Sequence, residues 1–359
     1  MKISINYKIL WSIGILLGSI SISHAQNKSV SLGNIFIPAK GNVAIFSDHN
    51  FQEIGNGLLP GIVATDRSEN NGKIVFSQNS GWINADNYSH VDGFVGSMKD
   101  SPFLLPTGDN GIYAPVGVSN GLNVEAAYYA VDPSFAVTSV VLSDEYTDMP
   151  EDGPFDIQSI VSNVESVSDQ EYWKVKGSAN TKITLTWNEV SNLEELVESN
   201  LEDLTIVGWN GAEWVDIPSS LDEKMINIKI SSLALSNKRS NFTTGSITTD
   251  EEMIPDTYSV ITLGKLRFDK NLDHNSLILY PNPVSAGSYL NVRYQLAKSD
   301  KGELKLFDSS NQLVHFEKLD GLKNKIKIPL NKYGRGVFSV AITSDNGTTV
   351  YKKLIVVDL

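Results

Sequence analysis

Hydrophobic and polar residues alternate along most of the chain after residue 26, in short runs separated by Gly, Asn and Asp. In the run at 182–187, Ile183, Leu185 and Trp187 fall on one face of an extended chain, because successive side chains of a strand point to opposite sides. Comparable runs lie at 30–38, 43–46, 73–77, 94–98, 137–143, 171–177, 204–209, 213–217, 242–249 and 258–264. The pattern predicts an all-β fold.

Turn residues predict how these strands are connected. Asn210-Gly211 lies between two runs and predicts a tight hairpin, because both residues tolerate a positive φ. Ala39-Lys40-Gly41-Asn42 is predicted to turn the chain between the runs at 30–38 and 43–46. The segment 103–116 predicts a hairpin with Gly108 and Gly111 at its tip, and it resembles hairpins of exported Bacteroidetes surface proteins.

The strands are predicted to form two β-sandwich-like units, at residues 26–135 and 136–264, followed by a polar linker at 265–276. No repeat of solenoid type is evident. One segment, Asn192 to Leu204, has its apolar residues spaced for one face of a helix.

The first 25 residues predict a secretory signal peptide. Lys2 and Lys8 precede a mainly apolar run from Ile9 to Ile22, and Ser23-His24-Ala25 offers small side chains around a cut before Gln26. The run is shorter than the roughly 20 apolar residues that a membrane-spanning helix needs. We therefore expect cleavage and export.

The segment at 277–359 opens with Tyr280-Pro281-Asn282-Pro283 and closes with Lys352-Lys353 before an apolar run. Short alternating runs lie between these ends, at 304–308, 325–330 and 336–342. Their order and spacing resemble the C-terminal sorting domain of the type IX secretion system, by which Bacteroidetes export proteins across the outer membrane.

This resemblance implies a small Ig-like β-sandwich that the secretion machinery recognises and a sortase-like enzyme removes, with attachment to surface lipopolysaccharide as one outcome. The protein would be secreted, or anchored at the outer-membrane cell surface, by way of the periplasm. The motif residues that carry the resemblance are Tyr280, Pro281, Asn282, Pro283, Gly336, Lys352 and Lys353. Ser309-Ser310-Asn311 stands where such domains commonly have an Asp-x-x-Gly turn, and Phe338 replaces the commoner Tyr. We expect Asn to adopt the same left-handed turn.

Charge divides the chain at the same place. Residues 277–359 carry 12 Lys and Arg against 7 Asp and Glu, a net of +5, whereas residues 26–276 carry 15 against 35, a net of −20. An acidic surface repels phosphate backbones, so nucleic acid is excluded as a partner of the larger part. Cysteine is absent, which excludes disulfides and thiolate metal sites.

No catalytic motif is evident, and no histidines are spaced for a metal. Asp269 to Asn275 places oxygen-bearing side chains at alternate positions, as a calcium loop would, but His274 and Tyr280 stand where such a loop needs Gly and Glu. A cluster of five acids at 143–153 leaves calcium open as a ligand, beside the interpretation as a solvated loop. We expect no cofactor.

The sequence thus predicts a non-catalytic secreted or cell-surface protein, structural or adhesive. The alternative is a polysaccharide-binding module or a secreted glycan-degrading enzyme, because a glycosidase needs only two carboxylates at a set separation. Carbohydrate-binding modules stack sugars on exposed aromatic rings. Candidates are Trp209 or Trp214, which flank a turn, and one residue of the pair Tyr128-Tyr129, since neighbours in a strand face opposite sides.

Overall fold

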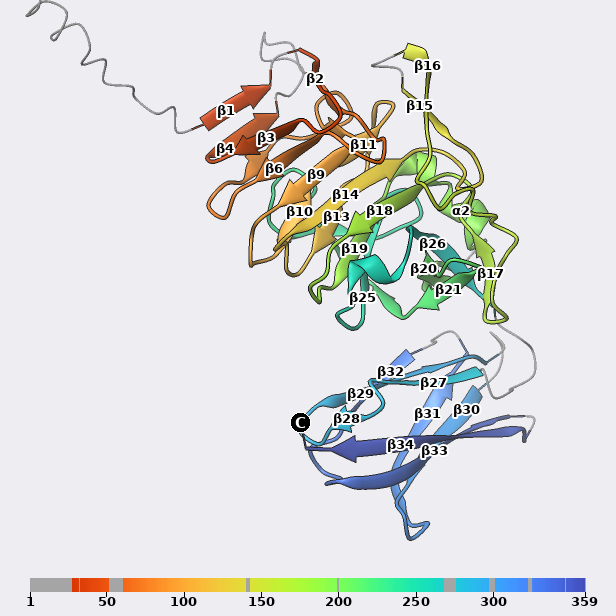
Figure 1. Cartoon of the computed structure of the whole chain (residues 1–359). Coiled ribbons are helices and arrows are strands. Elements are labelled where there is room, and N and C mark those ends of the chain that lie inside the picture. The colour runs from red at the N-terminus through yellow and green to blue at the C-terminus, as the bar shows by residue number, and fades with distance from the viewer. Residues whose placement is uncertain are drawn as a thin grey trace, which may run out of the picture.

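The computed structural model describes residues 28–31, 33–51, 61–139, 143–198, 200–267, 276–296, 301–321, 325–345 and 347–358. Figure 1 shows two bodies, one built from β1 to β26 and the other, coloured blue, from β27 to β34. The predicted all-β class is confirmed. The signal peptide predicted at 1–25 lies outside the described residues. Within those residues, none of the helices has the length and apolar character to cross a membrane.

The strands β1 to β9 form a three-sided parallel stack. Their bounds are β1 Lys28–Ser31, β2 Ile35–Ile37, β3 Asn42–Ile45, β4 Asp48–Phe51, β5 Val63–Thr65, β6 Lys73–Phe76, β7 Trp82–Ile83, β8 Val91–Asp92 and β9 Phe94–Ser97. Three parallel ladders run through them, β1-β4-β7, β2-β5-β8 and β3-β6-β9. Each group of three strands is therefore one coil of a parallel β-helix.

This stack confirms one expectation and corrects another. The predicted turn at Ala39–Asn42 connects β2 to β3, and each of these strands pairs in parallel with a strand of the next coil. A repeat is present, although its spacing is uneven: Ile35, Val63 and Val91 lie 28 residues apart, whereas Lys28 pairs with Asp48 after only 20. The uneven spacing, caused by loops of different length, is why the sequence shows no solenoid period.

After β9 the strands become mainly antiparallel. They are β10 Phe103–Leu105, β11 Thr107–Asp109, β12 Ile112–Tyr113, β13 Val116–Val118, β14 Val124–Tyr129, β15 Val137–Ser139, β16 Ser143–Asp148, β17 Val164–Val167, β18 Tyr172–Lys176, β19 Ile183–Trp187, β20 Leu204–Trp209, β21 Trp214–Ile217, β22 Ser219–Leu221, β23 Lys224–Ile226, β24 Leu235–Arg239, β25 Gly245–Thr249 and β26 Ile261–Leu266. Two predicted hairpins are confirmed, β11–β12 around Asn110-Gly111 and β20–β21 around Asn210-Gly211. Of the two glycines expected at the first tip, only Gly111 lies there, because Gly108 is part of β11 and pairs with Tyr113.

Among the described residues, helical structure is confined to single turns. The segment predicted as a helix at Asn192–Leu204 contains only α2 (Leu193–Leu196) and the 3-10 turn η2 (Leu201–Asp203), with η1 (Glu189–Ser191) before them and η3 (Pro255–Thr257) farther on. Asn192 has a positive φ and interrupts the turns on either side of it. The two buried apolar residues Leu193 and Val197 anchor the segment to the core.

The expected boundary between residues 135 and 136 lies within one continuous sheet. In the order β21-β20-β26-β18-β14-β9-β6-β3, strand β14 pairs with β9 on one side and with β18 on the other. One hydrophobic core extends from Ile37 to Leu263. The two predicted units therefore form a single body. Strand β26 also reaches Leu266, so the first residues of the predicted linker belong to this sheet.

Both faces of this sheet are covered, which changes the aromatic expectations. Tyr128 packs in the main core and Tyr129 in a second cluster on the opposite face, and each is 1% exposed. Trp209 and Trp214 belong to that second cluster and are buried too. The tyrosine expected to point outward, and the exposed tryptophan expected beside the Asn210-Gly211 turn, are thus core residues.

Arg67 is buried where the parallel coils give way to antiparallel strands. Its guanidinium donates to the carbonyl oxygen of Tyr128 at 2.6 Å and to the carboxylate of Asp92 at 2.7 Å, and lies 3.3 Å from the carboxylate of Asp109. It also lies 4.5 Å from the centre of the Tyr129 ring. One cation thus links β8, β11 and β14. Because two carboxylates share it, burial and repulsion from Asp92 raise the pKa of Asp109 to about 6, against the attraction of Arg67.

The C-terminal body is a β-sandwich with its own core, as predicted. Its strands are β27 Leu277–Tyr280, β28 Val284–Ser285, β29 Tyr289–Tyr294, β30 Lys301–Phe307, β31 Leu313–Asp320, β32 Lys325–Pro329, β33 Gly336–Ser344 and β34 Thr349–Val357. They form a three-stranded sheet, β27-β29-β32, and a five-stranded sheet, β28-β34-β33-β30-β31. A separate hydrophobic cluster, from Leu277 to Val356, lies between them.

Replacing Arg67 with Gln is expected to destabilise the larger body by about 3–5 kcal/mol, because it leaves buried carboxylates without a counter-charge. Tryptophan fluorescence during urea unfolding measures this body alone, since residues 277–359 contain no Trp. Arg239→Gln is the control: its ion pair with Glu223 is 78% exposed on both sides, and its loss should cost less than about 1 kcal/mol. Equal effects of the two variants would contradict the assigned role of Arg67.

Glu171 is expected to make the stability of the larger body depend on pH. Its carboxyl is fully buried and accepts a hydrogen bond from the Tyr128 hydroxyl at 2.7 Å, and burial raises its pKa from 4.5 to about 7. The folded state therefore holds this proton over a pH range in which the unfolded state has lost it. The resulting stability is fully present below about pH 4.5 and is lost as the pH rises through 7.

We compare the unfolding free energy of the natural protein with that of Glu171→Gln from pH 4.5 to 8. The difference isolates Glu171, because the other titratable groups contribute equally to the pH dependence of both proteins. Relative to the variant, the natural protein should lose about 3 kcal/mol over this range. Two parallel curves would show that Glu171 does not hold its proton in the fold.

Candidate functional site

The motif Tyr280-Pro281-Asn282-Pro283 connects the two sheets of the C-terminal sandwich. It follows β27 and precedes β28, so the prolines lie where the chain leaves the first strand of the domain. Proline has no backbone N–H to donate to a ladder. The main chain therefore cannot pair with a neighbour through the nitrogens of Pro281 and Pro283.

Asn282 supplies the missing contact with its side chain. Its amide nitrogen donates to the carbonyl oxygen of Lys353 at 2.8 Å, and its amide oxygen accepts from the backbone N–H of Ile355 at 3.0 Å. Just beyond it, β28 pairs in parallel with β34 at Val356 and Val357. The Asn282 amide thus continues this ladder by one step. It joins the opening motif to the closing Lys352-Lys353 strand, which lies more than 60 residues later in the sequence.

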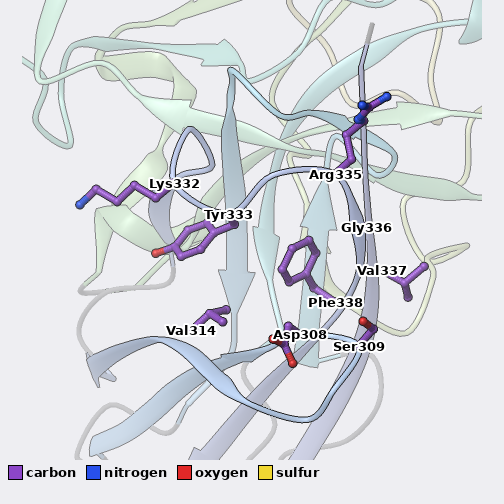
Figure 2. Close-up of a pocket in the computed structure, with 9 residues that line it drawn as sticks. All are labelled: Asp308, Ser309, Val314, Lys332, Tyr333, Arg335, Gly336, Val337 and Phe338. Carbon is purple, nitrogen blue, oxygen red and sulfur yellow. The ribbon is translucent and has the colours of Figure 1, made fainter.

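Gly336 and the lysine pair lie around two adjoining hollows on the five-stranded sheet. The larger hollow, about 670 Å³, is shown in Figure 2 and is lined by Asp308, Ser309, Val314, Lys332, Tyr333, Arg335, Gly336, Val337 and Phe338. The smaller, about 300 Å³, shares Asp308, Ser309, Val337 and Phe338 with it and adds Lys352 and Lys353. Figure 2 shows the rings of Tyr333 and Phe338 side by side, with Val337 pointing away.

The backbone around these hollows is set by two turns. Gly334 and Gly336 have positive φ angles of 66° and 154°, which a side chain would disfavour. Gly336 is the first residue of β33, and Gly334 lies two residues before it. Asp308 accepts from the backbone N–H groups of Ser310 and Gln312 at 2.8 and 2.9 Å, and Asn311 has a φ of 61°. The left-handed turn expected at Asn311 is therefore present.

The side chain of Tyr280 points away from the other motif residues. Its ring is on the three-stranded sheet and its hydroxyl donates to Asp250 of the larger body. The structure thus brings together Asn282, Gly336, Lys352 and Lys353, with the prolines beside Asn282, and separates Tyr280 from them. Sequence reasoning missed Asp308 and Tyr333 as lining residues. Only the turn motif beginning at Asp308 offered a signal.

Another hollow, about 550 Å³, lies on the larger body beside the Arg67 cluster. Asp148 lines it, and burial raises the pKa of this carboxyl to about 6 although Arg67 opposes the shift. Lys174 lines the same hollow, and burial together with the charge of Lys176 lowers its pKa. The hollow therefore combines a carboxyl whose pKa is raised to about 6 with three cationic side chains, Arg67, Lys174 and Lys176.

The two calcium hypotheses concern residues 143–153 and 269–275. Residues 268–275, which include the alternating Asp269 to Asn275 motif, lie outside the described residues, as do the side chains of Asp144 and Glu145. Among the residues whose positions are described, no three His, Asp or Glu side chains are grouped so that they could hold a metal ion.

Comparison with known families identifies the smaller body. Residues 278–357 match the family of secretion system C-terminal sorting domains. This confirms that the chain carries a type IX sorting domain and is exported to the cell surface or beyond it. The larger body has no family assigned. No curated protein matches the chain.

Asn282→Ala is expected to loosen β34 in the sorting domain, because the variant loses two hydrogen bonds to backbone groups that β28 does not reach. Two such bonds contribute about 1–3 kcal/mol. Amide hydrogen exchange should become about tenfold faster, or more, at Ile355. Asn331→Ala, at an exposed position of the same domain, is the control. Unchanged exchange at Ile355 would show that Asn282 does not hold this strand.

Proposed function

We propose that residues 26–267 act as a non-catalytic structural or adhesive protein at the cell surface, delivered there by the sorting domain. The observation that carries the proposal is the first coil of the parallel stack, whose outer side pairs with no other described strand. Ile35 faces the interior like Val63, its partner in the next coil, yet Ile35 is 43% exposed and Val63 is 2% exposed. Val43 and its partner Ile74 differ in the same way.

The same end of the stack carries further exposed apolar side chains. Phe36 lies in β2, and Phe46 directly follows β3 and is 77% exposed. Among the described strands, β1, β2 and β3 each have a partner on one side only. An open strand edge flanked by apolar side chains pairs readily with a strand of another macromolecule. This combination favours adhesion or assembly.

The polar groups of the larger body support the same proposal. Arg67, Asp92 and Asp109 bond to one another inside the fold, and Glu171 is bonded to Tyr128. The described tryptophans, which would form a sugar-stacking platform, are all buried: Trp82, Trp173, Trp187, Trp209 and Trp214. Side chains that serve the core are not available to a substrate. We also propose that the body needs no cofactor.

The second candidate is a glycan-degrading or glycan-binding protein, and the hollow at Asp148 favours it. A carboxyl with a pKa of about 6 suits a general acid, and Glu69 and Glu151 line the same hollow as candidate second carboxylates. We also propose that a sortase-like enzyme removes the sorting domain and that the protein is then attached to surface lipopolysaccharide. The resemblance of the sorting domain supports this proposal.

The test uses a strain lacking this protein, complemented with the natural chain, with Phe46→Lys or with Tyr88→Lys. Tyr88 is 60% exposed and is distant in sequence from the first coil, so its variant is the matched control. The natural chain and Tyr88→Lys should restore cell-to-cell or cell-to-surface adhesion, and Phe46→Lys should restore less than half of it.

Hydrolysis assays on the exported protein separate the two candidates. We expect no turnover of any polysaccharide. Turnover that disappears in Asp148→Asn would overturn the non-catalytic proposal and establish the second candidate. Equal adhesion with and without the natural chain would remove the support for an adhesive role.

A further inference from the structure

Strand β29 of the sorting domain is buried on both of its faces. Leu290, Val292 and Tyr294 point into the core of the domain. Asn291 and Arg293 alternate with them and therefore point out of the domain. Nevertheless, Asn291 is only 5% exposed and Arg293 only 4% exposed. An arginine on the outer face of a sandwich is this deeply buried only when another surface covers it.

The covering surface belongs to the larger body. The Arg293 guanidinium contacts both carboxylate oxygens of Asp216 in β21, at 2.7 and 3.0 Å, and donates to the hydroxyl of Thr205 in β20 at 3.2 Å. The side chains of Arg293 and Asp216 are each 4% exposed. Charged groups removed this far from water need a partner with good geometry, and here each has one.

Neighbouring side chains extend the contact. Strand register places Lys325 of β32 opposite Arg293, and Tyr280 of β27 opposite Asn291, so all four lie on one face. Lys325 forms an ion pair with Asp250, which also accepts from the Tyr280 hydroxyl. The Asn291 amide donates to Glu251 at 3.2 Å. Figure 1 shows this three-stranded sheet on the side of the sorting domain that faces the larger body.

The charges of the two bodies match this arrangement. The sorting domain supplies Arg293 and Lys325, and the larger body supplies Asp216, Asp250 and Glu251. The net charges of +5 and −20 have the same complementary signs. Burial alone would raise the pKa of Asp250, but Lys325 outweighs it and holds this pKa below its ordinary value. The carboxylate is thus stabilised in its charged, paired form.

We propose that the outer face of β27-β29-β32 is a docking surface, and that the acidic surface formed by Asp216, Asp250 and Glu251 on the larger body is its receptor. The sorting domain is then held to its own cargo by non-covalent contacts as well as by the chain. In this arrangement the secretion machinery recognises the five-stranded sheet, with its hollows and Lys352-Lys353. Tyr280 is not available to the machinery, because its hydroxyl is bonded to Asp250 of the cargo.

The experiment starts from the full mature chain with a specific protease site introduced within 268–275. After cleavage at micromolar concentration, both pieces should elute together in gel filtration. The dissociation constant is then measured by fluorescence anisotropy of a label on the sorting piece. Arg293→Gln should weaken the complex at least about 30-fold, because it leaves Asp216 buried without its counter-charge. Asp216→Asn, on the other piece, should have a similar effect.

Arg335→Gln is the matched control, since Arg335 lies in the same domain and pairs with Asp358 in an ion pair that is 71% and 63% exposed. It should change the dissociation constant less than about threefold. If Arg293→Gln does not fold, Asp216→Asn decides the matter, because it leaves the sorting domain unaltered. Separation of the cleaved natural protein into two peaks, or equal affinities of Asp216→Asn and Arg335→Gln, would overturn the proposal.

Discussion

The buried guanidinium of Arg67 is the contact on which the larger body depends most. A parallel coil and an antiparallel sandwich have different strand geometries, and the chain passes from one to the other around β9 to β14. At that junction Arg67 follows β5, and its partners lie in β8, β11 and β14. Buried charge is stable only when paired, so these strands can pack in few alternative ways. We regard specificity of packing, more than added stability, as the role of this cluster.

The sorting domain solves a comparable problem with a neutral side chain. Its chain must leave one sheet and enter the other, and two prolines at the crossing remove the backbone donors. The amide of Asn282 replaces a strand residue, because it presents one donor and one acceptor as a peptide group does. The motif is therefore structural first. It holds the first and last strands together, and the surface formed there carries Lys352 and Lys353.

The two bodies are connected by polar contacts, although each has its own apolar core. Between them lie ion pairs and hydrogen bonds from one face of the sorting domain to an acidic surface of its cargo. Polar interfaces of this kind can separate without exposing a large apolar area. This suits a domain that travels with its cargo through the secretion machinery.

The local pattern of residues in the sequence was sufficient to predict part of the structure. Period-two alternation determined the strands and the all-β class, Asn210-Gly211 and the segment at 103–116 determined their hairpins, and the Tyr-Pro-Asn-Pro opening with the final strands determined the sorting domain. These features depend on residues near one another in the chain, where backbone preference and side-chain alternation act directly.

Pairing between distant strands was decided only by the tertiary structure. A strand such as β3 has the same alternation whether its partner is antiparallel and adjacent or parallel and a coil away, so the stack could not be recognised from the sequence. The burial of side chains on outer faces was likewise decided only by the tertiary structure. Alternation places Tyr129 and Arg293 on outer faces, but a second layer covers each of them, and that layer comes from residues far along the chain.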